Sequence, residues 1–292
     1  MSDVTRNPGT TAGAPAGASS RPDGGRTTPD PMLARATGFR AFLGLLQRDI
    51  WNTLRHELGG FLAQSLMQPL AFLFVFGLVL PEIGAVDEGY ATQLLPGIIA
   101  LTLVLTALQN VALPLVIEFS YTKEIEDRLL APISPLMVGV EKLVFATGRS
   151  LIAALLILPL GAVILPDGLQ TGGANWGVFA LLLVVGGLAG ASIGLVLGTS
   201  VPAKRINMVF ALALTPLIFT GATFYPWQLL DSLRWFQVLT LVNPLTYVSE
   251  GMRAALTSSP HLGAEWIALG LGVSTVAFAT VGLRGFVRRA VD

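Results

Sequence analysis

The stretch WGVFALLLVVGGLAGASIGLVLGTSV, residues 176–201, contains no Asp, Glu, Lys or Arg side chain. About 20 consecutive apolar residues in a helix cross the roughly 30 Å hydrocarbon core of a membrane. This stretch is long enough to do so, and it therefore decides the fold class. It also has a glycine at every fourth position, at Gly186, Gly190, Gly194 and Gly198. On a helix these glycines form a continuous groove without side chains, so we predict that another helix packs closely against them.

Five more apolar stretches of comparable length are spread along the chain. They cover residues 60–80, 94–117, 143–165, 207–224 and 264–287. The composition agrees with a membrane location, because only 12% of the 292 residues are charged, about half the charged fraction of a typical soluble domain. We therefore predict an all-α membrane protein with six transmembrane helices, in which residues 32–292 form one transmembrane domain.

Two segments before the first apolar stretch differ from it in composition. Residues 1–31 are rich in Gly, Ala, Pro, Ser and Thr. They have too few apolar side chains to offset chain entropy, which predicts a disordered tail. Residues 33–58 combine apolar and basic side chains at helical spacing: Phe39, Phe42, Leu43, Leu46, Ile50 and Leu54 with Arg40, Arg48 and Arg55. This pattern predicts an amphipathic helix that lies at the membrane surface.

Apart from Arg234 and Arg253 in the stretch 225–260, the basic residues near the predicted spans gather at alternate connections and at the two ends. They are Arg35, Arg40, Arg48, Arg55, Lys123, Arg128, Lys142, Arg149, Lys204, Arg205, Arg284, Arg288 and Arg289. Residues 81–92 and 166–175 carry only acidic charges. The positive-inside rule then places both termini in the cytoplasm, and an even number of spans agrees with this because it requires both termini to lie on the same side. We expect a multi-pass protein of a bacterial cytoplasmic (inner) membrane.

Residues 225–260 are also apolar, but prolines and charged side chains interrupt them. We predict two short re-entrant helices here, on the outer side, rather than a seventh span. Glu250 and Arg253 lie about one helical turn apart, and we expect them to pair with each other or with nearby backbone groups. Arg149 is the one charged residue well inside a predicted span. We expect its side chain to snorkel to lipid phosphates rather than to contact a substrate.

The connection 118–137 contains a short charged stretch with helical spacing. Two oppositely charged pairs lie four residues apart in it, Glu124 with Arg128 and Lys123 with Asp127. Ile125 and Leu129 lie on one face of the same helix. A short amphipathic helix of this kind can dock into a groove on a soluble partner, and an ordinary solvated loop helix is the alternative.

The sequence lacks the residues that several kinds of site require. It has no cysteine and only two histidines, so we predict no metal site. No catalytic dyad or acidic cluster is evident, which argues against a membrane-embedded lipid-modifying enzyme. No predicted span has a central acid or histidine, which argues against an ion-coupled secondary transporter. The chain has no Gly-Lys dipeptide and hence no phosphate-binding loop for ATP hydrolysis. Because the net charge of the chain is zero, we expect no nucleic-acid partner.

Two motifs are similar to those of a known family. The first is Glu124-Ile125-Glu126-Asp127-Arg128-Leu129-Leu130-Ala131-Pro132-Ile133-Ser134, followed by Val140-Glu141-Lys142. It resembles the cytoplasmic signature of ABC-2 type permeases, although many relatives have Gly-Thr where this chain has Glu126-Asp127. The second is Phe219-Thr-Gly-Ala-Thr-Phe-Tyr-Pro226 with Asn243-Pro-Leu-Thr-Tyr247 and Glu250-x-x-Arg253. It resembles the family's region between the fifth and sixth spans, especially in drug-resistance and nodulation-type exporters.

The resemblance covers residues 33–290 and implies the permease subunit of an ABC exporter for a drug, polyketide or lipid-linked glycan. Two permease subunits, identical or different, would pair in the lipid membrane, and two copies of a separate ATPase, which binds ATP and Mg, would dock beneath them. The chain itself would be no enzyme and would bind no cofactor. The resemblance assigns ATPase coupling to Glu124, Ile125, Asp127, Arg128, Leu129 and Pro132. It assigns the re-entrant region to Tyr225, Pro226, Asn243, Pro244, Tyr247, Glu250 and Arg253.

Overall fold

The computed structural model describes residues 31–87, 89–122, 134–165 and 173–291. All regular elements in these ranges are helices, and no strand occurs among them. Five helices in the described part of the chain are long and apolar enough to cross a membrane. The predicted all-α membrane fold is confirmed at this level. Apart from Pro31, the predicted disordered tail lies outside the described residues.

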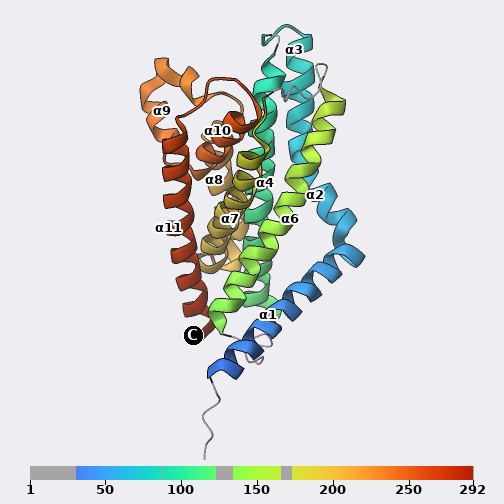
Figure 1. Ribbon diagram of the computed structural model, residues 1–292, viewed down its shortest axis with the longest axis vertical. Helices are drawn as coiled ribbons and strands as arrows, with labels where there is room; N and C mark the ends of the chain where they lie inside the picture. Colours follow the sequence, from blue (N-terminus) through green and yellow to red (C-terminus); the bar gives the residue numbers. More distant parts are fainter. Residues whose placement is uncertain (1–30, 88, 123–133, 166–172, 292) are drawn as a thin grey trace, which may run out of the picture.

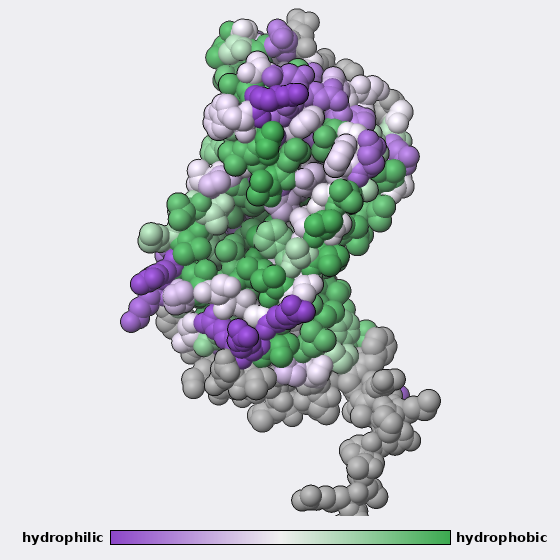
Figure 2. Space-filling view, turned by 90° about the vertical axis from the view of Figure 1, so that its left-hand side faces the viewer, coloured by the Kyte–Doolittle hydropathy of each residue, from purple (hydrophilic) through white to green (hydrophobic). Residues whose placement is uncertain are grey.

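The long helices stand side by side in one bundle (Figure 1). Four of them are unbroken: α4 (Tyr90–Ile117), α6 (Pro135–Ile164), α7 (Trp176–Ser200) and α11 (Ala264–Val291). Figure 2 shows hydrophobic side chains over the middle of one face and hydrophilic side chains gathered toward its ends. This distribution suits a helix bundle in lipid, because hydrocarbon does not solvate polar groups.

The remaining long helix is bent near its middle. Its parts follow one another without a break: α1 (Pro31–Asn52), the π-helical segment η1 (Thr53–Glu57), α2 (Leu58–Phe74), a second π-helical segment η2 (Val75–Val79) and α3 (Leu80–Glu82). At Glu57 the backbone angles are φ -117° and ψ -7°, far from the usual helical values of about -63° and -42°. Figure 1 shows α1 lying obliquely below the bundle while α2 rises along it. The predicted boundary between the surface helix 33–58 and the first span therefore coincides with a bend in a continuous helix.

Helix α4 lies at the centre of the bundle, where it contacts α2, α6, α7 and α10 (Pro244–Leu256). In its most apolar window 78% of the residues are buried, against 61% in α7 and 33% or less in the other membrane-length helices. Its contribution to the main core includes Leu94, Ile98, Leu101 and Leu103. The other helices therefore shield α4 from lipid.

Three of the four evenly spaced glycines of α7, Gly190, Gly194 and Gly198, face α4, while Gly186 lies against Val248 of α10 and Leu103 of α4. A Cβ atom built on Gly190 would lie 2.6 Å from the carbonyl oxygen of Val104 and 2.9 Å from its Cα. A Cβ atom on Gly194 would meet the backbone of Leu108 in the same way, with the Cα 2.9 Å away. There is no space for a side chain at either position, so the backbones of α4 and α7 are in direct contact along this seam.

The predicted fifth span differs from the other five. After a short turn of 3-10 helix, η4 (Ala203–Arg205), the helix α8 (Ile206–Phe219) has only 14 residues. At 1.5 Å per residue it is about 21 Å long, less than the hydrocarbon thickness. It ends at Phe219 because residues 220–226 form an irregular turn, in which Ala222 has a positive φ of 49°. Helix length within the described residues thus supports five spans, and the predicted count of six is not confirmed.

Short helices occupy the region 225–260. The 3-10 helix η5 (Trp227–Leu233) leads directly into α9 (Arg234–Thr240), and α10 follows. Asn243 begins α10, because its Oδ1 accepts a hydrogen bond from the backbone N–H of Leu245 at 2.9 Å and Pro244 is the first helical residue. None of these helices is long enough to cross a membrane, in agreement with the prediction of no seventh span here. Their depth in the membrane stays a prediction.

Leucine in place of Gly190 or Gly194 should force α4 and α7 apart and destabilise the protein by about 1–3 kcal/mol or more, the usual range for overpacking. The measurement is thermal unfolding of the purified protein in detergent. Gly272→Leu on α11 is the matched control, because a Cβ atom there would meet nothing within 4 Å. If Gly190→Leu and Gly194→Leu unfold at the same temperature as the control, the seam is not a packing constraint.

Candidate functional site

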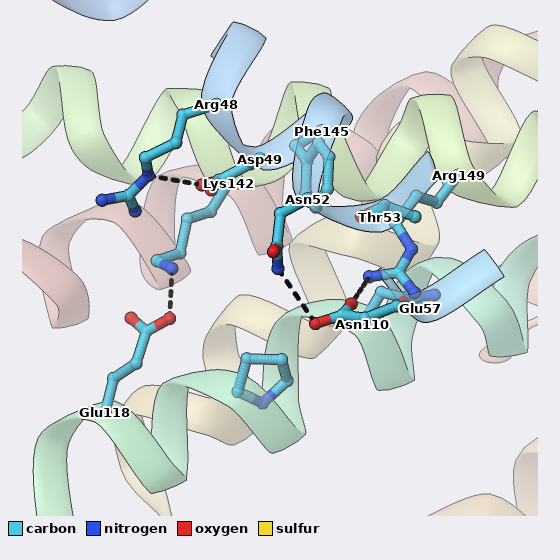
Figure 3. Close-up of a pocket in the computed structure, with 11 residues that line it drawn as sticks. Arg48, Asp49, Asn52, Thr53, Glu57, Asn110, Glu118, Lys142, Phe145 and Arg149 are labelled. Atoms are coloured by element: carbon cyan, nitrogen blue, oxygen red, sulfur yellow. Dashed lines mark hydrogen bonds and ion pairs between the residues drawn. The ribbon is translucent and has the colours of Figure 1, made fainter. Parts of the chain in front are cut away.

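A polar cavity of about 410 Å³ lies where α1, η1, α4 and α6 meet (Figure 3). The elements that line it come together at the end of the bundle beneath which α1 lies (Figure 1). Its lining residues come from all four elements and from the π-helical turn η3 (Glu118–Thr122): Arg48, Asp49, Asn52, Thr53, Glu57, Asn110, Pro114, Glu118, Lys142, Phe145 and Arg149. Charged and amide side chains inside a membrane protein are expensive to bury, and they therefore mark a candidate functional site.

Two close ion pairs line this cavity. The Lys142 Nζ atom donates a hydrogen bond to Glu118 Oε1 at 2.6 Å, and each side chain is 10% exposed. Arg48 Nε lies 3.2 Å from Asp49 Oδ1 nearer the surface. A buried charge is tolerated only beside its counter-charge. The pair of Lys142 and Glu118 therefore ties the end of α4 to α6, on either side of the connection between them.

Arg149 points into the same cavity but makes a looser ion pair. Its Nη1 atom is 3.8 Å from Glu57 Oε2, beyond hydrogen-bond distance. The guanidinium lies over the ring of Phe61, 4.3 Å from the ring centroid, and 5.7 Å from that of Phe145. The Nε atom is buried and donates no hydrogen bond. We expected this side chain to snorkel to lipid phosphates; the structure instead turns it inward, because aromatic rings and Glu57 surround it.

A smaller cavity of about 180 Å³ adjoins the first, and the two share Asn110, Pro114 and Arg149. Its other lining residues are uncharged: Phe61, Gln64, Ser65, Thr106, Gln109 and Leu113. Amides and hydroxyls donate and accept hydrogen bonds without adding charge. Arg149 thus stands between a cavity lined by charges and a cavity lined by neutral polar groups.

Sequence reasoning did not select most of this site. It singled out Arg149 but neither Glu57 nor Asn110, and it did not pair Glu118 with Lys142. A signal for the last pair is present in the sequence, because Glu118 and Lys142 carry opposite charges at the facing ends of the consecutive apolar stretches 94–117 and 143–165. That Glu57 and Asn110 line this cavity could not be predicted from the sequence, because it depends on how α1 folds back beneath the membrane-spanning helices.

A second buried polar cluster lies at the opposite end of the bundle. Glu250 and Arg253 of α10 form an ion pair with both side chains fully buried, which agrees with the expected pairing. Glu250 also accepts hydrogen bonds from the backbone N–H groups of Trp227 at 3.0 Å and Leu262 at 2.7 Å. Arg253 Nη2 donates to the carbonyl oxygen of Ala222 at 3.2 Å. These partners satisfy the carboxylate with backbone groups, so we interpret the cluster as a support for the surrounding turns.

The other residues selected in the re-entrant region support the same turns. Asn243 Nδ2 donates to the carbonyl oxygen of Leu217 at 2.8 Å. The hydroxyl of Tyr247 donates to Leu241 O, and that of Tyr225 to Phe219 O, each at 2.6 Å. Pro226 immediately precedes η5, and Pro244 is the first residue of α10.

The predicted ATPase-coupling residues lie outside the described residues. These are Glu124, Ile125, Asp127, Arg128, Leu129 and Pro132. Within the described ranges there is no group of three or more His, Cys, Asp or Glu residues that could hold a metal ion.

Comparison with known proteins relates the chain to a transporter family. A model of the ABC-2 type transporter family matches residues 40–257, which is most of the chain. The chain belongs to this family. The predicted resemblance to ABC-2 type permeases is therefore confirmed. The match extends from α1 to the end of α10, and so it contains both cavities and both buried ion pairs.

Two permeases are among the similar proteins. The inner membrane transport permease YadH of Escherichia coli K12 is 25% identical over 213 residues, which cover 70% of this chain and 80% of YadH. The putative transport permease ycf38 of Cyanophora paradoxa is 27% identical over 241 residues, or 77% of this chain and 80% of that protein. The aligned lengths indicate that the likeness extends over most of each protein.

Removing one partner of the pair Glu118 and Lys142 should leave the other charge buried and unpaired. We expect Glu118→Gln or Lys142→Met to lower the free energy of unfolding by about 3–5 kcal/mol. The exchange Glu118→Lys with Lys142→Glu should recover part of this loss. The control is Arg234→Gln, because its ion pair with Asp231 is largely exposed and such pairs contribute about 1 kcal/mol or less. Equal effects of Lys142→Met and Arg234→Gln on unfolding in detergent would show that the buried pair has no special role.

Proposed function

We propose that this chain is the transmembrane permease subunit of an ATP-driven exporter in a bacterial cytoplasmic membrane. The observation that carries the proposal is the family match over residues 40–257, together with the apolar helices of membrane length. The names of the two relatives, both transport permeases, support a role in transport. The description of YadH as an inner membrane protein supports that location.

The energy for transport comes, in this proposal, from a separate ATPase. The sequence has no Gly-Lys dipeptide and therefore no phosphate-binding loop of the usual kind. Two ATPase copies, which bind ATP and Mg, would dock on the side that carries the connection 118–137. A second permease subunit, identical or different, would complete the pathway.

The proposed topology has six crossings, with both termini in the cytoplasm. In it, α8 and the irregular turn 220–226 cross together, so that the helix need not span the membrane alone. Polar contacts support this arrangement, because the turn is anchored to the outer ends of other helices. Tyr90 at the start of α4 donates a hydrogen bond to Phe224 O at 2.8 Å, and Arg253 Nη2, near the end of α10, donates to Ala222 O at 3.2 Å.

The substrate class that we propose is an amphipathic or lipid-like molecule, such as a drug, a polyketide or a lipid-linked glycan. Two features support it. One face of the bundle is apolar over its middle (Figure 2), and polar cavities lie at the level where α1 meets the spans. An amphipathic molecule could therefore reach polar groups directly from lipid.

Dependence on an ATPase tests this function. The partner is recovered from native membranes with the tagged permease, and the complex is reconstituted in proteoliposomes. We expect ATP-dependent movement of an amphipathic dye with the complex and none with the permease alone. Transport driven by an ion gradient without the ATPase would contradict the proposal and favour an ion-coupled carrier.

Substitutions in the predicted docking helix, within the connection 118–137, test the same proposal more directly. Ile125→Asp together with Leu129→Asp places charges on the apolar face of the predicted docking helix, at a cost of about 2–4 kcal/mol if that face is an interface hot spot. The double variant should fold normally, yet lose transport and either ATPase copurification or stimulation. Full transport by this variant would make the segment an ordinary connecting loop. Leu136→Asp on the exposed start of α6 is a control outside the predicted docking helix.

Single cysteines can test the topology, because the chain has none of its own. Ser232 lies in η5 and Ser258 follows α10, and both are exposed. We expect Ser232→Cys and Ser258→Cys to react with a membrane-impermeant thiol reagent added outside intact cells. Lys204→Cys, exposed in η4, should react only after the membrane is opened. Reaction of Ser258→Cys solely in opened membranes would mean a further crossing before α11.

A further inference from the structure

Arg149 lines both of the adjoining cavities. Of the three basic residues that line them, it lies farthest from a carboxylate. Its distance to the acidic partner is 3.8 Å, compared with 3.2 Å for Arg48 and 2.6 Å for Lys142. The face of its guanidinium rests on the ring of Phe61. Stacking of this kind holds a guanidinium in place while its edge remains available for hydrogen bonds.

One edge of that guanidinium lacks an acceptor. The Nε atom of Arg149 is buried and donates no hydrogen bond. A buried donor without an acceptor is unfavourable, especially on a charged group. An anionic oxygen brought into the cavity would supply both the missing acceptor and a closer counter-charge.

Glu57 is poorly placed to fill that role itself. Its side chain is 51% exposed, and its Oε1 atom accepts a hydrogen bond from Asn52 Nδ2 at 3.2 Å. It also lies at the bend between η1 and α2, where its backbone leaves the helical conformation. A carboxylate with these contacts can turn toward solvent at little cost, so an incoming anion could replace it beside Arg149.

The groups around Arg149 indicate what else the ligand carries. Gln64, Gln109 and Asn110 offer neutral hydrogen-bonding groups in the smaller cavity, beside apolar Phe61 and Leu113. Because Lys142 and Arg48 face carboxylates more closely, one anionic group is expected rather than several. The combination suits a single carboxylate or phosphate attached to an apolar body.

We propose that the two adjoining cavities bind an amphipathic molecule with one anionic group, which pairs with Arg149 and displaces Glu57. The inference rests on the proposed function and narrows it, because it names a class of substrate and the residue that recognises it. Figure 3 shows the geometry: Arg149 and Glu57 point toward one another, and Asn110 lies beside them.

Binding to the full chain can be measured without the ATPase. The purified protein in a neutral maltoside detergent is titrated with decyl phosphate, and its thermal unfolding is followed. We expect saturable stabilisation. The comparison ligands are decyltrimethylammonium, decanol and inorganic phosphate, and we expect little effect from each. Equal stabilisation by decyltrimethylammonium or decanol would overturn a site for anions, and equal stabilisation by inorganic phosphate would overturn a site for amphiphiles.

Two variants should change this binding in opposite directions. Arg149→Gln should weaken decyl phosphate binding about tenfold or more, because a charge-assisted hydrogen bond is lost. Glu57→Gln should tighten it several-fold, because the competing carboxylate is gone. Arg205→Gln, exposed and away from the cavities, should bind like the parent. If Arg149→Gln does not fold, Glu57→Gln still tests the proposal: tighter binding of decyl phosphate supports the site, and unchanged or weaker binding overturns it.

A purely structural role for the pair predicts a different pattern. Both Arg149→Gln and Glu57→Gln would then lower the unfolding temperature without changing affinity for decyl phosphate, which would overturn the proposal.

A lipid source is distinguished by competition: vesicles of phosphatidylglycerol, but not of phosphatidylcholine, should displace decyl phosphate if a lipid headgroup is the natural ligand, and the site itself would be supported. Unaltered transport and binding by Arg149→Gln would remove the site and leave the exporter function standing.

Discussion

The arrangement of the bundle depends on direct contact between the backbones of α4 and α7. In a membrane, apolar side chains are not driven together by water, so helices associate where close packing gains dispersion energy. The glycines of α7 allow that approach, and Val104 and Leu108 of α4 supply the opposing backbone. With the two helices in contact, α6, α10 and α11 pack around them and leave α4 the most buried of the long helices.

Buried charges occur as ion pairs near both ends of the bundle, but the two environments differ. The cluster of Glu250 and Arg253 is filled by backbone donors and acceptors from three turns. The cluster that contains Glu118 and Lys142 borders a cavity of about 410 Å³. Both satisfy the requirement that buried charges be paired. The second borders this cavity, and this difference separates a supporting cluster from a candidate binding site.

The bend between α1 and α2 creates that room. If the first helix continued straight through residues 53–57, its polar side chains would not lie beneath the spans. The π-helical segment η1 turns α1 under the bundle (Figure 1), and Asn52, Thr53 and Glu57 thereby meet α4 and α6. A local departure from α-helical geometry is thus part of the site, as is common for π-helical segments.

The sequence by itself determined the fold class, the positions of five long helices, the glycine spacing and the family, because each depends on a local pattern of apolar residues, small residues or short motifs. It also predicted that Glu250 and Arg253 pair, since they lie one turn apart on a helix. It did not determine the length of α8, which ends at a turn where Ala222 adopts a positive φ. The inward orientation of Arg149 was likewise decided by the tertiary structure. That side chain is held by Phe61 and Glu57 of the bent first helix, and contacts between residues so far apart in sequence depend on the path of the whole chain.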